Sequence, residues 1–131
     1  MRPNEDAAVR DLYHLCHPDF ATPGPYWHFA HPTLVLTVKG RIVGSTSFML
    51  SPDAKRGYVC YGADVCVHPA HRKVGYGRQL HEARCAIARD LGAIDFVGTV
   101  EPGNTAMVTI LSRAGHKMSS ALDRDFYIER L

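Results

Sequence analysis

The chain contains 131 residues, of which 46% are apolar and 21% charged, and this composition excludes a disordered protein. Its 15 lysines and arginines nearly balance 13 aspartates and glutamates, so bulk charge argues against a nucleic-acid partner. No apolar run is long enough to cross a membrane, and the first ten residues lack the apolar stretch of a signal peptide. We therefore expect residues 1–131 to form one cytoplasmic domain with no membrane partner.

The first part of the chain predicts a helix, a loop and a β-hairpin. Apolar side chains at helical spacing indicate a helix that begins at about Asn4 or Asp6 and ends at Cys16. Its expected buried side chains are Ala8, Val9, Leu12, Leu15 and Cys16. Residues 17–32 hold four of the eight prolines and are interpreted as a loop. Two strands, over residues 33–38 and 42–50, flank a Lys-Gly-Arg turn signal at residues 39–41 and predict a hairpin.

The middle of the chain predicts a strand followed by a helix. After a polar connection over residues 51–57, residues 58–67 form a strongly apolar strand, in which Gly62 suggests a bulge or a close backbone approach. A helix is expected over residues 77–91, ended by Gly92. Its expected buried side chains are Leu80, Ala83, Ile87 and Leu91.

The last part of the chain completes an alternating pattern. It predicts a strand over residues 94–100, a helix over residues 104–114 with Asn104 as its N-cap, and two short strands over residues 117–119 and 126–131. This order predicts an α/β fold with a mixed sheet, in which a βαβ crossover joins two parallel strands.

The cysteines and histidines do not indicate a metal or a disulfide framework. No CxxC pair occurs among the four cysteines, which are Cys16, Cys60, Cys66 and Cys85. We expect reduced, partly buried thiols that take no part in catalysis. His68 and His71 form an HxxH pattern in a loop that contains proline, whereas zinc sites of this spacing usually lie on a helix, so no metal is expected.

Residues 65–78, VCVHPAHRKVGYGR, join a buried strand to a helix through a short basic loop. The residues of interest there are Arg72, Lys73, Gly75 and Gly77. The first N–H groups of a helix have no partner within the helix, and the helix dipole favours negative charge at that end. Glycines let the backbone approach an oxyanion closely. The segment therefore predicts a phosphate-binding loop, and the alternative is a turn with solvated charges.

This loop matches neither common nucleotide motif. Leu80 stands where the dinucleotide fingerprint needs its third glycine, and no Gly-Lys-Ser/Thr sequence occurs. Residues 72–77, Arg-Lys-Val-Gly-Tyr-Gly, instead resemble the (Gln/Arg)-x-x-Gly-x-(Gly/Ala) motif of the GNAT superfamily of N-acetyltransferases. The resemblance extends to Val67-His-Pro69 before the motif, to Asn104 and Gly115 of the later helix, and to the amino-terminal helix.

The resemblance implies a GNAT-like fold, in which a central, mostly antiparallel sheet splays at one parallel strand pair and carries helices on both faces. It also implies acetyl-CoA as co-substrate, with the pyrophosphate on N–H groups of residues 74–78 and the pantetheine arm along strand residues 65–67. The residues that it implicates in acetyl-CoA binding are Val65, Cys66, Val67, Arg72, Lys73, Val74, Gly75, Tyr76, Gly77, Arg78 and Asn104.

The implied reaction is direct transfer of the acetyl group from sulfur to an amine of a small molecule or a protein. Backbone N–H groups near Val67 are the expected donors to the oxyanion that develops. The candidate catalytic residues are Asp64, Tyr61 and His28, with His17 and His31 as alternative bases. For Asp64, the alternative role is a hydrogen bond to the strand bulge.

Two positions depart from the pattern of many members. Ala63 stands where they carry a glutamate, and Leu111 stands where they carry a tyrosine that protonates the leaving thiolate. The alternative function is therefore a CoA-binding module without transferase activity, which would act as a sensor or an interaction protein. A homodimer is also consistent with the family.

Residues 17–31 are expected to wall the amine site. They concentrate aromatic and histidine side chains and hold a single carboxylate, that of Asp19. Because each ammonium group of a polyamine would need an acidic partner once it loses water, this composition favours an α-amine or an amine that contacts aromatic rings. The alternative is that the loop only packs on the sheet.

Overall fold

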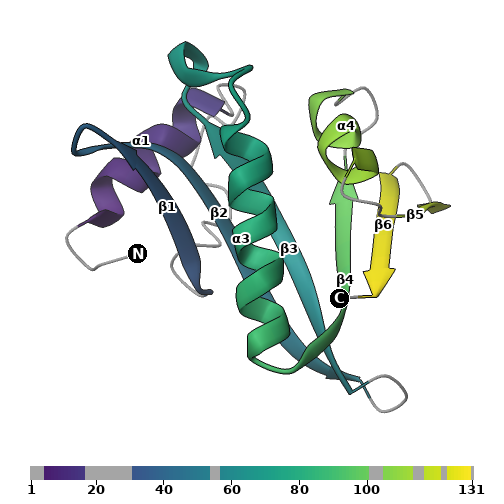
Figure 1. Cartoon of the computed structure of the whole chain (residues 1–131). Helices are drawn as coiled ribbons and strands as arrows, with labels where there is room; N and C mark the ends of the chain where they lie inside the picture. Colours follow the sequence, from purple (N-terminus) through teal and green to yellow (C-terminus); the bar gives the residue numbers. More distant parts are fainter. Residues whose placement is uncertain are drawn as a thin grey trace. The chain divides into compact units, whose positions relative to one another are not determined.

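A computed structural model of the chain describes residues 5–16, 31–53, 57–100, 105–113, 117–121 and 124–130. Its elements, in chain order, are α1 (Asp6–Cys16), β1 (Thr33–Val38), β2 (Arg41–Asp53), β3 (Gly57–Val67), the 3-10 turn η2 (Pro69–His71), α3 (Tyr76–Asp90), β4 (Ala93–Val100), α4 (Thr105–Arg113), β5 (Lys117–Ala121) and β6 (Arg124–Arg130) (Figure 1).

The six strands of the described residues form one mixed sheet in the order β1-β2-β3-β4-β6-β5. The recorded pairs β1/β2, β4/β6 and β5/β6 are antiparallel, whereas β3 and β4 are parallel and are joined by α3. The predicted α/β class, with a mostly antiparallel sheet and one parallel pair, is therefore confirmed. The predicted connection over residues 51–57 is too long, because β2 continues to Asp53 and β3 begins at Gly57.

The chain divides into two compact units that interleave along the sequence. One contains residues 1–48 and 64–84, and the other contains residues 49–63 and 85–131. The first unit holds α1, the β1–β2 hairpin, the end of β3 and the start of α3. The second holds β4, α4, β5 and β6. The assignment of residues 1–131 to a single domain stays a prediction.

The β1–β2 hairpin of the first unit contains one extra residue. Lys39 and Gly40 turn the chain with φ angles of +51° and +79°, as a two-residue hairpin turn requires. The pairing then passes from Thr37↔Ile42 to Leu36↔Gly44, which leaves Val43 as a bulge in β2. A bulge reverses the alternation of side chains between the two faces of a strand.

The contacts on either side of the bulge show this reversal. Ile42 packs against Leu12 and Tyr13 of α1, whereas a Cβ at Gly44 would lie 2.9 Å from Leu80 Cδ1 of α3. Figure 1 shows α3 in front of β2 and α1 behind it. Helices therefore cover both faces of this part of the sheet, as the resemblance implied.

In α1 the buried side chains are those of Val9, Leu12 and Tyr13, and Cys16 is half-buried. Their spacing of three, four and seven residues places them on one face of a helix. The prediction of the helix is confirmed, but the inclusion of Ala8 and Leu15 among its buried side chains is wrong, because both side chains are exposed, that of Leu15 to 51%.

The buried face of α3 differs from the predicted one. Of the predicted side chains only Leu80 is buried, and the residues buried with it are His81, Arg84, Cys85 and Ala88. The exposed fractions of Ile87 and Leu91 are 36% and 59%. Hydrogen bonds explain why polar side chains replace apolar ones on this face. Arg84 Nε donates to His81 Nδ1 at 3.1 Å, and Arg84 Nη1 donates to Thr46 Oγ1 of β2 at 2.8 Å.

In the second unit, β3 and β4 pair from Tyr58↔Ala93 to Gly62↔Gly98. The ladder has one irregularity, between Tyr58 and Val59, and the bulge or close backbone approach suggested at Gly62 stays a prediction. Gly62 is the last residue of β3 in this ladder, and residues 63–67 continue the strand beyond it. The ladder thus ends five residues before β3 does.

We predict that Thr46→Val destabilises the protein by about 1–3 kcal/mol, because it removes the acceptor of a buried guanidinium N–H. Urea denaturation would measure the change in the free energy of unfolding. Thr37→Val is the matched control, since Thr37 is exposed on β1. Equal stability of the two variants would contradict the role of this hydrogen bond.

Candidate functional site

The loop between β3 and α3 is held at its start by three backbone N–H groups. The His68 N–H donates to Val43 O of β2 at 2.8 Å, so the end of β3 is attached to the hairpin. Next, the His71 N–H donates to His68 O at 2.8 Å, and the Ala70 N–H donates to His68 Nδ1 at 3.1 Å. His68 therefore caps the η2 turn, which is a structural role for one member of the HxxH pattern.

The rest of the loop uses two residues with positive φ. Lys73 has φ +68° and Gly75 has φ +92°, and α3 begins at the next residue, Tyr76. A Cβ built on Gly75 would meet no atom within 4 Å. The backbone at Gly75 therefore faces open space, and any other residue there would be strained by its φ angle.

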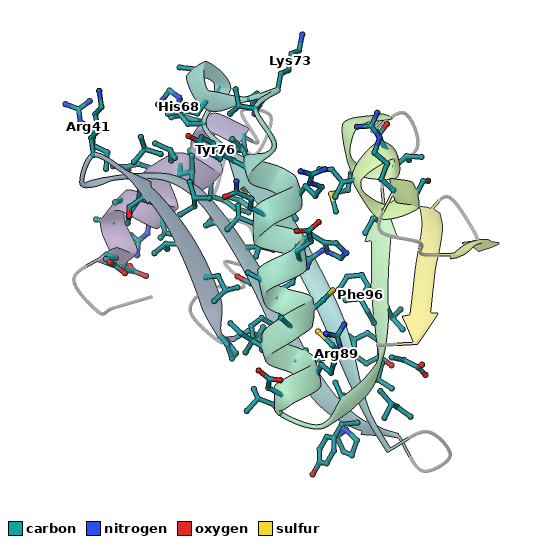
Figure 2. All side chains as sticks on the ribbon, viewed as in Figure 1. Arg41, His68, Lys73, Tyr76, Arg89 and Phe96 are labelled. Carbon is teal, nitrogen blue, oxygen red and sulfur yellow. The ribbon has the colours of Figure 1, made fainter. Side chains whose placement is uncertain are left out.

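The amino end of α3 lies directly beyond this glycine. The Gln79 N–H donates to Gly75 O at 3.0 Å, which is the first hydrogen bond of the helix. By helix geometry the N–H groups of residues 76–78 precede this bond and point out of the helix end. Arg72 and Lys73 are exposed beside them, and Figure 2 shows the Lys73 side chain extending away from the loop. This arrangement suits an anion.

One cation of the segment is already paired. Arg78 Nε lies 3.7 Å from Glu82 Oε1, one turn later in α3, and both side chains are more than half exposed. An exposed pair of this kind contributes little free energy and can open without much cost. Arg78 can therefore still contact a ligand.

At the end of β3, alternate residues present their backbone groups to alternate edges. Because the His68 N–H faces β2, strand geometry directs the N–H and C=O groups of Val65 and Val67 to the opposite edge. The His68 N–H is occupied by Val43, so among the N–H groups near Val67 it is not available as an oxyanion donor. The Cys66 side chain is buried against Leu12 and Tyr13 and contributes to the core.

The carbonyl oxygen of Val67 accepts two side-chain donors. Arg72 Nε lies 2.9 Å from it, and Cys16 Sγ lies 3.6 Å from it. Arg72 Nη2 also lies 3.8 Å from Cys16 Sγ. The guanidinium of the loop motif is thus fixed between the strand end and the carboxyl end of α1.

These neighbours change the acidity of Cys16. A side-chain hydrogen bond with Cys66 lowers its pKa most, burial raises it, and Arg72 and the Val67 backbone lower it further, so that the pKa of Cys16 lies at about 7 instead of 9.0. A considerable fraction of this thiol is therefore ionised at neutral pH. The expectation that the thiols take no part in catalysis stays a prediction. Sequence alone carries no signal for this environment, because the contacts come from residues about fifty positions away.

The other predicted site residues fall into two groups. Tyr61 is half-buried on β3, where it pairs with Val97 of β4. Asp64 lies on β3, but its side chain, like all of His28 and Asn104, lies outside the described residues. Leu111 is a core residue of α4 with 1% exposure.

A family model described as the acetyltransferase (GNAT) family matches residues 7–115. The chain belongs to this family. The resemblance of the loop motif is thereby confirmed, and the match includes both the loop and the helix that follows β4.

Known proteins of several kinds are similar to the chain. A glucosamine 6-phosphate N-acetyltransferase of Trypanosoma brucei brucei is 44% identical over 55 residues, which cover 40% of the chain and 37% of that protein. The chain therefore matches little more than a third of the length of this curated relative.

Two solved GNAT structures match over the whole chain. The protein yncA from Salmonella typhimurium, solved with its cofactor acetyl-CoA, is 24% identical with a TM-score of 0.77, and 90% of its chain is covered. A ribosomal-protein-alanine N-acetyltransferase from Brucella melitensis is 17% identical with a TM-score of 0.78, and 97% of its chain is covered. At these identities the likeness concerns the fold.

The described residues also bear on a membrane span and on a metal site. None of their helices combines the length and apolar character needed to cross a bilayer. Nor do they contain a group of three or more histidine, cysteine, aspartate or glutamate side chains placed to hold a metal ion.

We predict that iodoacetamide alkylates Cys16 with a rate that rises with pH and is half-maximal near pH 7, because the thiolate is the reactive form and the pKa of Cys16 is lowered to about 7. Arg72→Gln removes a hydrogen bond and a positive charge that stabilise the thiolate, so its midpoint should lie at higher pH. Peptide mass spectrometry would follow the label. An unchanged midpoint in Arg72→Gln would contradict the contact, and Arg78→Gln is the matched control.

Proposed function

We propose that the protein is an N-acetyltransferase that binds acetyl-CoA along residues 65–67 and 72–78 and acetylates a primary amine. The observation that carries this proposal is the β3–α3 loop. There a glycine with φ +92° faces open space beside two exposed cations and the amino end of a fifteen-residue helix. Family membership supports the same ligand, as does the acetyl-CoA of the similar yncA structure.

The residues of the loop fit the pyrophosphate of such a ligand. A Cβ at Gly75 would occupy the space that the phosphate oxygens need, and the N–H groups of Tyr76, Gly77 and Arg78 would donate to those oxygens. Lys73 and Arg72 add positive charge. The N–H of Val67 and the C=O of Val65 would bind the amides of the pantetheine arm, as an added strand does at a sheet edge. Acetyl-CoA itself supplies the acetyl group as an activated thioester.

Two proton transfers accompany the reaction: the amine loses a proton and the leaving thiolate gains one. Asp64 and Tyr61 of β3, with His28, are the residues that we propose to accept the amine proton, directly or through water. Because Leu111 is a buried core residue, α4 offers no hydroxyl at this position to protonate the leaving thiolate. A thiol with a pKa of about 8.5 can leave as the thiolate and take a proton from water, so the substitution is compatible with turnover.

For the acceptor, we propose an α-amine, such as the amino terminus of a peptide, rather than a polyamine. Reaching the neutral form at pH 7 costs about 1 kcal/mol for an α-amine and about 4–5 kcal/mol for a lysine-type amine, so a weak base is sufficient for the former. Proteins of similar fold include enzymes named for acetylating the alanine of a ribosomal protein. The local identity to a glucosamine 6-phosphate N-acetyltransferase supports a second candidate, an amino sugar phosphate.

We predict that Gly75→Ala weakens acetyl-CoA binding about tenfold or more, because the added methyl group projects into the space proposed for the pyrophosphate. Isothermal titration calorimetry would measure the affinity. Gly40→Ala is the matched control, since Gly40 also has a positive φ, of +79°, and no atom within 4 Å of a built Cβ. An equal affinity of the two variants would contradict the proposed binding loop, because backbone strain is common to both.

We predict that free CoA thiol is released with a peptide that has an amino-terminal alanine, and that spermidine gives a poor response. The rate with the peptide should rise between about pH 6 and 8, as a histidine or the amine loses its proton. Glucosamine 6-phosphate belongs in the same panel. Efficient acetylation of spermidine would contradict the acceptor class, whereas acetyl-CoA binding without turnover of any amine would favour the CoA-binding module.

A further inference from the structure

The Cys16 thiol has surroundings that acyl transfer to an amine does not require. It lies at the carboxyl end of α1, is half-buried, and packs against the buried cluster that contains Cys66 of β3. Arg72 Nη2 lies 3.8 Å from its sulfur. Two thiols and a guanidinium from three separate elements thus meet beside the loop proposed to bind pyrophosphate.

The two thiols differ in access. Cys66 has 1% exposure and packs against Leu12 and Tyr13, whereas Cys16 is partly exposed. A small oxidant in solution therefore meets Cys16 first. Arg72 stabilises the thiolate of Cys16, which is the form that oxidants attack. Cys66 belongs to the buried cluster against which Cys16 packs, and a resolving thiol needs such a position.

We propose that Cys16 and Cys66 form a reversible dithiol–disulfide pair that responds to hydrogen peroxide, with Cys16 as the attacked thiol and Cys66 as the resolving one. The inference rests on the geometry of these side chains and goes beyond the proposed function. It assigns a modification site to a pair of residues about fifty positions apart in the chain.

The Cys16 thiolate attacks one oxygen of hydrogen peroxide, the O–O bond breaks, and the sulfur becomes a sulfenic acid while hydroxide leaves and takes the thiol proton as water. The Cys66 sulfur then attacks the Cys16 sulfur, forming the S–S bond and releasing the sulfenic oxygen with the Cys66 proton as a second water. One peroxide is reduced and two thiols are oxidised. An added dithiol returns both cysteines to thiols by exchange.

Oxidation would also change the surroundings of Arg72. In the reduced protein its guanidinium lies between Val67 O and Cys16 Sγ. A disulfide sulfur carries no negative charge and is a weak hydrogen-bond acceptor, so the guanidinium would keep mainly its contact with the Val67 carbonyl. Oxidation of the pair would therefore change the contacts of Arg72, a residue of the loop motif.

The experiment treats the full chain with hydrogen peroxide, blocks remaining thiols with iodoacetamide, and maps tryptic peptides by mass spectrometry. We expect a disulfide between the peptide of residues 11–39, which holds Cys16, and that of residues 57–72, and its loss after treatment with dithiothreitol. Because trypsin leaves Cys60 and Cys66 on one peptide, the variants Cys60→Ala and Cys66→Ala identify the partner. The cross-link should persist in Cys60→Ala and fall at least about tenfold in Cys66→Ala.

Two results would overturn the proposal. One is oxidation of Cys16 to sulfinic acid in the wild-type chain without a cross-link. The other is a cross-link that persists in Cys66→Ala. Cys85→Ala serves as a control for loss of a buried cysteine elsewhere. If Cys66→Ala does not fold, the wild-type chain still decides, because cleavage by chymotrypsin between Cys60 and Cys66, after Tyr61, separates the two candidate partners.

A second arm separates this inference from the proposed function. We expect acetyl-CoA at saturating concentration to slow formation of the cross-link, because a pyrophosphate bound to Arg72 withdraws the guanidinium from Cys16. A cross-link that forms at the same rate with and without acetyl-CoA would overturn the proposed contact between Arg72 and pyrophosphate and leave the dithiol pair standing. Absence of the cross-link with normal acetyl-CoA binding would overturn the dithiol pair alone.

Discussion

The carbonyl oxygen of Val67 is the point on which the geometry of the site depends. It ends β3, accepts a hydrogen bond from Arg72 Nε, and receives Cys16 Sγ from α1. The next residue, His68, donates its N–H back to the hairpin. These hydrogen bonds hold the end of β3 to α1, to the β1–β2 hairpin and to Arg72. They therefore fix the position at which the following loop begins. The left-handed backbone at Lys73 can persist because the two ends of the loop, β3 and α3, are held by regular structure.

The bulge at Val43 determines which face of β2 each of the helices α1 and α3 contacts. Without the bulge, Ile42 and Gly44 would lie on the same face of the sheet. Ile42 could then not face α1 while Gly44 faces α3. With it, Ile42 packs on α1, and the small surface of Gly44 accepts Leu80 of α3. The close approach at Gly44 places the start of α3, and hence its N–H groups, relative to the strand end.

The sequence predicted the order and type of the elements well, because apolar periodicity and glycine positions are local signals. It predicted the loop motif for the same reason, since Arg72 to Gly77 are contiguous. It was wrong on the buried face of α3, because hydropathy assigns Arg84 and His81 to solvent, and only their hydrogen bonds with each other and with Thr46 permit burial. The lowered pKa of Cys16 was equally out of reach, since it arises from Cys66 and Arg72. The acceptor site stays a prediction that rests on composition.

The extra residue in β2 also bears on how this chain can vary in evolution. Substitutions at Val43 change one side chain and keep the pairing pattern, so apolar replacements of similar volume are compatible with the fold. Deleting the residue would remove the bulge. The β2 side chains on one side of the deletion, either Gly44 to Phe48 or Ile42 and the residues before it, would then point to the opposite face of the sheet. Insertions and deletions should therefore be rare at this position among related sequences, even where the residue itself is free to change.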